Sequence, residues 1–218
     1  LGDVYKRQVH YALLSIKEKE KERFIMKLRK CLMVCALAAV MTVGSASVAS
    51  AAGSRTMNVT VQAEGISVAA KIEESEAYKQ LEESAPEVVS ILDKVNDGTM
   101  EMKDVTAELT KMAEGLTDET AKAALEEVIT KLESKDFVTG FVDLTADATA
   151  EKNENGKYEV TIDVPSMTDE ATGYDVLHYS VERSVWELIE PSETDAEAKT
   201  ITAEFEDLSP VAVVADAE

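Results

Sequence analysis

The chain has 218 residues, with 22 Lys and Arg against 43 Asp and Glu, which gives a net charge of −21 at pH 7. Nucleic-acid binding requires clustered basic side chains that displace counterions, and the sequence after residue 51 has no such cluster. We therefore expect no nucleic-acid partner, and we expect anionic membrane surfaces to repel the mature protein.

The first 51 residues are not expected to belong to the folded protein. Residues 1–8, LGDVYKRQ, resemble the adaptor read-through seen at the ends of metagenomic open reading frames, and we expect residues 1–25 to be upstream translation. Residues 26–51 have the three parts of a secretory signal: a basic start, an apolar stretch at 31–43 and small residues up to Ala51. This pattern predicts cleavage after Ala51 or Ala52 and a secreted or cell-surface protein.

An uncleaved membrane anchor is the alternative interpretation of residues 26–51. A membrane span needs about 20 strongly apolar residues, whereas the second half of this segment consists mainly of Ser, Gly and Ala. Cleavage therefore fits the sequence better, and no membrane association is expected afterwards.

Removal of residues 1–51 takes away nine basic residues, four acidic residues and both cysteines, so the remaining chain has a net charge near −26. An exported chain without thiols has no disulfide framework, and burial of apolar surface must stabilise it. His178 is then its only histidine. The sequence therefore predicts no metal site and no cofactor.

Residues 52–72 have the two-residue period of β-strands. Apolar residues alternate with polar ones at Met57, Val59 and Val61, and again at Ile66 and Val68. Glu64 and Gly65 interrupt the pattern. The segment is therefore either a hairpin or one edge strand that leads into helices, and it could join the sheet formed by the end of the chain.

Residues 73–135 have helical periodicity and predict a small antiparallel helical bundle. The four expected helices are 73–83, a second that starts at Ser84, Pro86 and Glu87 and stops at Asn96-Asp97-Gly98, a third at 102–115, and a last one capped by Thr117. Each helix has an apolar stripe, so each needs a packing partner.

Residues 136–218 change to short strands separated by turn residues. Six runs are visible, at 137–146, 156–165, 174–180, 185–190, 199–205 and 210–215. Strands of this number and length favour an Ig-like antiparallel β-sandwich. The expected fold class is therefore α+β, a helical bundle followed by a sandwich.

No combination of residues in the sequence indicates a catalytic site. Glu182 and Glu187 are the best available pair of carboxylates, but both are expected on the surface, and a glycosidase needs one acid of raised pKa. His178 shares a strand face with Ser180, but no acid that would orient the imidazole is evident. We therefore expect a protein that is not an enzyme.

The turn EKNENG at 151–156 resembles the start of a calcium-binding loop, with oxygen-bearing side chains followed by glycine. Such a loop needs a bidentate acid at its twelfth position, and that position holds Ile162. Asn155-Gly156 between two alternating runs instead favours a β-hairpin.

The end of the chain, from about residue 156 to residue 215, resembles a β-module that recurs in secreted and surface proteins of Gram-positive bacteria, including gut clostridia. The residues that carry the resemblance are Val176-Leu177-His178-Tyr179, Trp186-Glu187, Phe205 and Leu208-Ser209-Pro210-Val211-Ala212-Val213. The resemblance implies a β-structured module of an exported protein and implies no enzymatic activity.

Together these patterns predict a non-catalytic exported protein that acts as an extracellular structural or protein-interaction module. The alternative is a carbohydrate-binding module that uses exposed aromatics, for which Tyr174, Tyr179 and Trp186 are the candidate ligand-binding residues. The partner would be an extracellular protein or a glycan.

Overall fold

The computed structural model describes residues 59–168 and 170–217. The chain divides into two compact units, Ser47–Glu114 with Asp118–Glu218, and Leu1–Ala46 with Gly115–Thr117. Of the second unit, only residues 115–117 are described. The expected signal peptide and its cleavage site lie outside the described residues.

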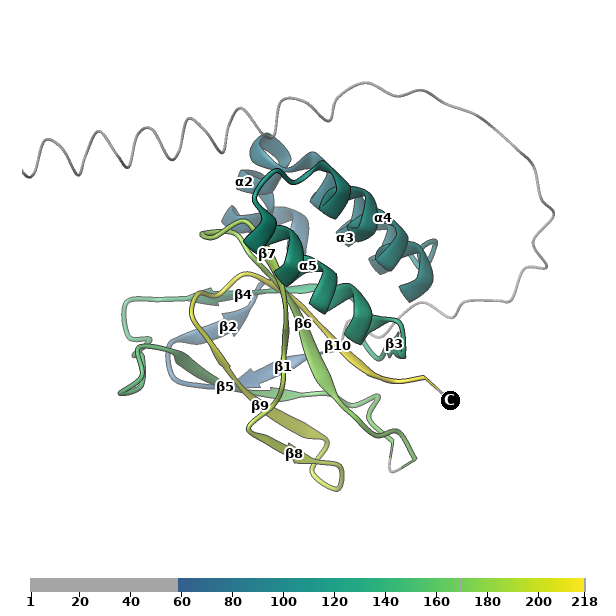
Figure 1. The fold of residues 1–218 in the computed structure, drawn as a ribbon. Coiled ribbons are helices and arrows are strands. Elements are labelled where there is room, and N and C mark those ends of the chain that lie inside the picture. Colours follow the sequence, from purple (N-terminus) through teal and green to yellow (C-terminus); the bar gives the residue numbers. More distant parts are fainter. Residues whose placement is uncertain (1–58, 169, 218) are drawn as a thin grey trace, which may run out of the picture. The chain divides into compact units, whose positions relative to one another are not determined.

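The strands form two antiparallel sheets (Figure 1). The four-stranded sheet has the order β1 (Thr60–Gln62), β5 (Tyr158–Asp163), β9 (Thr200–Phe205) and β8 (Glu193–Asp195). The six-stranded sheet has the order β2 (Ile66–Val68), β4 (Val142–Ala146), β10 (Pro210–Asp216), β6 (Asp175–Ser180) and β7 (Val185–Ile189), and β3 (Lys135–Phe137) pairs with the far end of β10. With the helices described below, the fold is mixed α+β, as predicted.

The main hydrophobic core lies between the two sheets. On the four-stranded sheet, β5 and β9 alternate between buried and partly exposed residues, so only one face of this sheet is covered. The buried side chains Val160, Ile162, Ile201, Ala203 and Phe205 pack against Val176, Val211 and Val213 of the six-stranded sheet.

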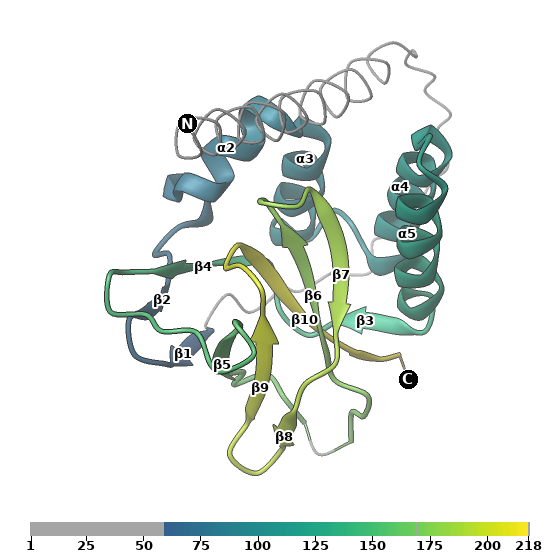
Figure 2. The same ribbon diagram turned by 60° about the vertical axis from the view of Figure 1, so that its left-hand side comes forward.

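The six-stranded sheet is buried on both faces. Consecutive residues of β6 from Val176 to Ser180 are all buried, as are Pro210 to Ala215 of β10. Because neighbouring strand residues point to opposite faces, a continuous buried run requires a covering layer on each side. The four-stranded sheet covers one face, and the helices cover the other (Figure 2).

The helical layer consists of a short 3-10 helix, η1 (Ile72–Glu74), and four α-helices: α2 (Glu76–Ser84), α3 (Pro86–Asn96), α4 (Met102–Gly115) and α5 (Glu119–Leu132). Helix α2 packs against α3, and α5 packs against β7 and β3. The helices therefore lie on the sheet, and the antiparallel bundle predicted from the sequence is not confirmed.

The first residues of the helices were predicted less accurately than their apolar faces. Ser84 does not cap α3, because it still belongs to α2 and its hydroxyl donates to the Gln80 carbonyl at 2.7 Å. The N-cap of α3 is Ala85, which has no capping side chain, and the N-cap of α5 is Asp118 instead of Thr117. Asp118 is preferred because its carboxylate accepts from two backbone N–H groups of the first turn.

Neither the hairpin predicted at Asn155-Gly156 nor the hairpin alternative for residues 52–72 is present, because the strands on either side of each turn belong to different sheets. β1 pairs with β5 and β2 pairs with β4, so the chain passes from one sheet to the other around Gly65, which has φ +71°. Likewise β4 and β5 do not pair. The Asn155-Gly156 turn is tight, with the Asn153 N–H donating to the Lys157 carbonyl at 2.8 Å, but it connects two sheets.

An Ig-like strand order is not confirmed. In an Ig domain the last strand lies at the edge of its sheet, whereas β10 lies inside the six-stranded sheet, between β4 and β6. The six predicted runs all contain strands, and β8 was missed because its residues Glu193 to Asp195 are polar and exposed.

Candidate functional site

A polar cluster closes one end of the core between the two sheets. It combines His178 and Ser180 of β6, Glu187 of β7, and Asp207 and Ser209 of the β9–β10 connection. His178, Ser180 and Ser209 have no exposed surface, and Asp207 is buried. We call these five residues the core-end cluster.

His178 uses both nitrogens of its ring within the cluster. Its Nε2 lies 2.8 Å from the Ser209 Oγ, and its Nδ1 lies 3.4 Å from the Glu187 Oε2. Glu187 is the direct cross-strand neighbour of His178, so the β6–β7 register places this acid. The imidazole also meets the Phe205 ring edge-on, with ring centroids 5.6 Å apart.

Asp207 anchors the two serines. Its carboxylate accepts from the Ser180 Oγ at 2.6 Å and from the Ser209 Oγ at 2.9 Å. The single Ser209 proton can serve only one acceptor. When that proton goes to Asp207, the His178 Nε2 must donate to Ser209. A neutral imidazole has only one ring proton, so the Nδ1 can donate to Glu187 only when the ring is doubly protonated.

Arg183, in the β6–β7 turn, covers the cluster from the solvent side. Its guanidinium donates to both Glu187 oxygens, at 2.5 and 2.6 Å, and lies 3.4 Å from an Asp207 oxygen and 3.2 Å from a Glu206 oxygen. The hydrogen bond from His178, together with Arg183, lowers the pKa of Glu187 to about 2. Glu187 is therefore a fixed carboxylate at neutral pH.

The order Ser209, His178, Glu187 has the connectivity of a nucleophile, base and orienting acid. A nucleophile must reach a substrate, however, and both Ser209 and His178 are wholly buried. The Ser209 hydroxyl also donates to Asp207. In this arrangement the cluster is suited to holding β6, β7 and the β9–β10 connection together, and neither the Ser209 hydroxyl nor the His178 ring reaches solvent.

The sequence placed His178 and Ser180 on the same face of one strand, and in the structure their side chains have different partners. The Ser180 hydroxyl bonds to Asp207, and His178 instead meets Ser209, which is 31 residues away in sequence. Glu182 and Glu187 are not brought into a common cleft either, since Glu187 is held by His178 and Arg183. The signal for Ser209 was the L-S-P motif, whose partner depends on the pairing of β10 with β6.

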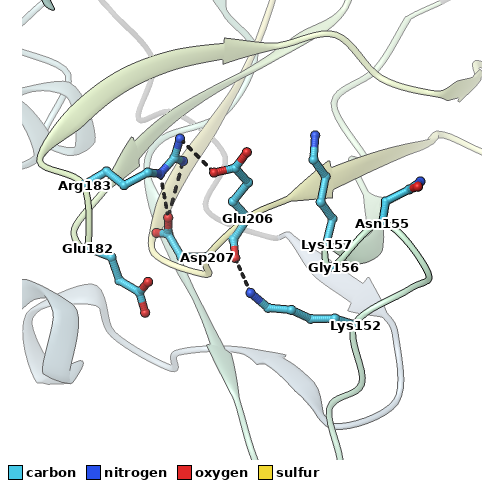
Figure 3. A pocket seen from close by; sticks show the side chains of 8 residues that line it. All are labelled: Lys152, Asn155, Gly156, Lys157, Glu182, Arg183, Glu206 and Asp207. Atoms are coloured by element: carbon cyan, nitrogen blue, oxygen red, sulfur yellow. Dashed lines mark hydrogen bonds and ion pairs between the residues drawn. The ribbon is translucent and has the colours of Figure 1, made fainter. Parts of the chain in front are cut away.

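A shallow hollow of about 250 Å³ lies beside the core-end cluster (Figure 3). It is lined by Lys152, Asn155, Gly156, Lys157, Glu182, Arg183, Glu206 and Asp207. The Lys152 ammonium donates to the Glu206 carbonyl at 2.6 Å and lies 4.8 Å from the centre of the Tyr158 ring. The hollow contains charges of both signs, and Arg183 with its partners Glu206 and Asp207 is part of its lining.

The three candidate aromatic residues for sugar binding are buried. Tyr174, Tyr179 and Trp186 are 7%, 4% and 5% exposed. Trp186 packs edge-on between Tyr179 and Phe141, with centroids 5.0 and 5.9 Å apart. Burial of these rings against neighbouring side chains removes the exposed aromatic platform that the carbohydrate-binding alternative requires.

Within residues 59–168 and 170–217, no group of three or more His, Cys, Asp and Glu side chains is arranged to hold a metal ion. In the calcium-like turn, the Asn153 Oδ1 accepts from the backbone of Asn155 and Lys157, so this oxygen is already used within the turn. Among the same residues, no helix has the length and apolar character of a membrane span.

Comparison of the chain with protein-family models, with curated proteins and with solved structures returned no match. The resemblance of residues 156–215 to a recurring β-module therefore stays a prediction.

Proposed function

We propose that this protein is an exported, non-catalytic bacterial protein that acts outside the cell as a structural or protein-interaction module. The observation that carries the proposal is where the residues of the resemblance lie. His178, Glu187, Phe205 and Ser209 come from four separate motif segments, and they meet in or directly beneath the core-end cluster.

This placement supports a structural role for the motif. Residues of a binding or catalytic motif normally line an accessible pocket, whereas His178, Phe205 and Ser209 are fully buried. Buried polar networks with every member hydrogen-bonded make a core specific for one arrangement. We infer that the motif is a packing signature of the module, and that recognition of a partner uses its exposed surface.

The negative charge of the surface also supports a role outside the cell. Several basic side chains on the helices are paired with acids, as in Lys111 with Glu108 and Lys131 with Glu127. The large excess of carboxylates then repels other acidic surfaces and limits non-specific association. Such a protein would act through a specific partner.

Export is tested by producing the full chain in a Gram-positive host and sequencing the N-terminus of the protein in the medium. We expect it to start at Ala52 or Gly53. Retention of the unprocessed chain in the cytoplasm would contradict the proposal. A variant with Lys27, Arg29 and Lys30 replaced by Glu serves as the control, since loss of the basic start should block export.

The absence of catalysis is tested with the purified mature chain on panels of glycans, peptides and chromogenic esters. We expect no turnover above buffer. Ester or peptide cleavage that is lost in both Ser209→Ala and Glu187→Gln, with folding retained by circular dichroism, would show that the core-end cluster opens and acts as a catalytic triad. That result would overturn the proposal.

A further inference from the structure

We propose that Asn155 is a site of spontaneous deamidation, by which the exposed turn at the rim of the hollow slowly gains a carboxylate. The inference is independent of the proposed function. It follows from the Asn155-Gly156 dipeptide, the free side chain of Asn155 and the open space at Gly156.

The reaction needs only water. The backbone nitrogen of Gly156 loses its proton to solvent and bonds to the Cγ of Asn155, the bond from Cγ to Nδ2 breaks, and the amide nitrogen leaves as ammonia. Water then opens the five-membered ring at either of its two carbonyl carbons. One opening gives aspartate, and the other gives isoaspartate, in which the main chain runs through the side-chain carbon.

The geometry leaves the Asn155 amide accessible, on a turn that is itself exposed. Asn155 is exposed, and its side chain has no hydrogen-bond partner among the described residues. Figure 3 shows its amide turned away from the other residues of the hollow. Gly156 has φ +75°, and nothing lies within 4 Å of the position that a Cβ would occupy, so the space beside this residue is open.

The other two asparagines of the described residues provide an internal comparison. Asn153 is followed by Glu154, and its amide donates to Glu204 at 2.6 Å while its oxygen accepts from two backbone groups. Asn96 is followed by Asp97, and its amide is held by the Phe141 backbone. Within the described part of the chain, a following glycine and a free amide coincide only at Asn155.

The turn itself limits the rate. The Gly156 N–H donates to the Asn153 carbonyl at 2.9 Å, and the Asn153 side chain holds the backbone of Asn155 and Lys157. The attacking nitrogen is free only when this hydrogen bond opens, which exposed turns do far more often than a core does. Loss of the Asn153 side chain should therefore accelerate the reaction.

The product changes the hollow. Aspartate or isoaspartate at position 155 adds a negative charge among Lys152 and Lys157, which line the same space. Isoaspartate also inserts one carbon atom into the main chain, inside the tight closure between Asn153 and Lys157. The turn must then loosen, and the rim of the hollow changes shape as well as charge.

The experiment follows the folded full chain during incubation at mildly alkaline pH in ¹⁸O-water. Proteolytic peptides that cover residues 151–158 and Asn96 are analysed by tandem mass spectrometry, which separates modification at position 155 from modification at position 153. We expect the parent peptide to be replaced by two products, each with one labelled oxygen at position 155, while Asn96 and Asn153 stay unchanged. The rate should rise with pH.

Two variants make the test specific. Asn153→Ala should convert severalfold faster than wild type, and Asn155→Gln, which would need a larger ring, should stay unmodified. The urea-unfolded chain calibrates the intrinsic rate. The proposal is overturned when the unfolded chain converts at position 155 and the folded chain does not, or when modification in the folded chain begins at Asn96 or Asn153.

Discussion

Asp143 has a buried carboxylate that lacks the hydrogen bonds an ionised group normally needs. It has no exposed surface, and neither carboxylate oxygen has a hydrogen-bond partner in the described part of the chain. Val142 and Leu144 on either side belong to the core between the sheets, so the Asp143 side chain points to the helical layer, near Ser75. Burial raises the pKa of Asp143 to about 6, and the Ser75 hydroxyl offsets this only in part.

We predict that Asp143→Asn stabilises the protein above pH 6. A carboxyl group whose folded pKa exceeds its unfolded value binds its proton more tightly in the native state, so stability is lost as the pH rises through the folded pKa. A shift from 3.8 to about 6 corresponds to at most about 3 kcal/mol at neutral pH. The gain from the Asp143→Asn substitution should therefore be largest at pH 7–8 and vanish near pH 4.

Urea unfolding of wild type and variant at a series of pH values measures this difference. Glu154→Gln, in an exposed turn, is the matched control and should change the free energy of unfolding little at any pH. A difference for Asp143→Asn that is independent of pH would show that Asp143 is not ionised at a cost in the native state.

Ser209 connects the two halves of the core-end cluster, since its hydroxyl lies within hydrogen-bonding distance of both His178 and Asp207. Ser209→Ala leaves buried polar atoms without that partner and should lower the free energy of unfolding by about 1–3 kcal/mol. Chemical unfolding tests this, with the exposed Ser134→Ala as control. Equal stability of the two variants would mean that the hydroxyl contributes nothing to the fold.

Between elements, the Asn96 side chain joins helix α3 to the segment before β4. Asn96, the last residue of α3, donates from its Nδ2 to the Phe141 carbonyl at 3.0 Å and accepts from the Phe141 N–H at 2.6 Å. Phe141 has no exposed surface, so its backbone has no access to water as a substitute. The pair of bonds fixes the end of α3 to the segment before β4.

Asn96→Ala should therefore destabilise the protein by about 1–3 kcal/mol, because two buried backbone groups lose their partner. Asn96→Asp retains the acceptor for the Phe141 N–H and loses the donor, so its stability should lie between those of the Asn96→Ala variant and wild type. Hydrogen exchange of the Phe141 amide provides the local readout. Unchanged protection in Asn96→Ala would contradict this assignment.

The elements themselves were largely predictable, because periodicity depends on neighbouring residues alone. In the predicted apolar stripe of α5, Leu125, Val128, Ile129 and Leu132 are buried, whereas Ala121 is only half-buried and Ala124 is exposed. Strands β5 and β9 alternate between buried and less buried residues, as predicted. Strand partners were not predictable. The Asn155-Gly156 turn predicts a tight reversal correctly, but which sheet receives β5 depends on β9 and β1, whose contacts are distant in sequence.

The candidate site was likewise only partly predictable, because its contacts join residues that are distant in sequence. The sequence singled out His178 and Trp186 as rare residues, but only the β6–β7 register, which pairs His178 with Glu187 and Tyr179 with Trp186, shows that they lie on opposite faces. Ser209 and Asp207 could not be assigned to His178, because their approach requires β10 to pair with β6. Burial of the Tyr174, Tyr179 and Trp186 rings likewise depends on the helices and loops that cover them.

At the scale of the whole molecule, β10 holds the six-stranded sheet together. It pairs with β6 on one side and with β4 and β3 on the other, and residues 211–214 are almost completely buried. At its end, the Lys135 ammonium forms salt bridges with Asp175 at 2.9 Å and Asp216 at 2.7 Å. The last strand of the described chain is thus an interior strand.

Truncation of the chain after Leu208 should therefore abolish cooperative unfolding, while the helices keep part of their signal in far-UV circular dichroism. The reason is that β3, β4 and β6 lose their common partner and the core loses Val211 and Val213. Loss of the edge strand β8, by replacing Glu193, Thr194 and Asp195 with Gly, Ser and Gly, is the control and should be tolerated. A cooperative transition in the truncated chain would contradict the central role of β10.

The position of β10 also determines when the six-stranded sheet can form during synthesis of the chain. Ribosomes add roughly 5–20 residues per second, and the strand that unites β3, β4 and β6 follows all of them in the sequence. Until β10 has been synthesised, β4 and β6 lack the strand that lies between them, and the six-stranded sheet cannot form. For the export that we propose, this delay keeps the β-region unfolded, and so able to cross a membrane, until β10 has been synthesised.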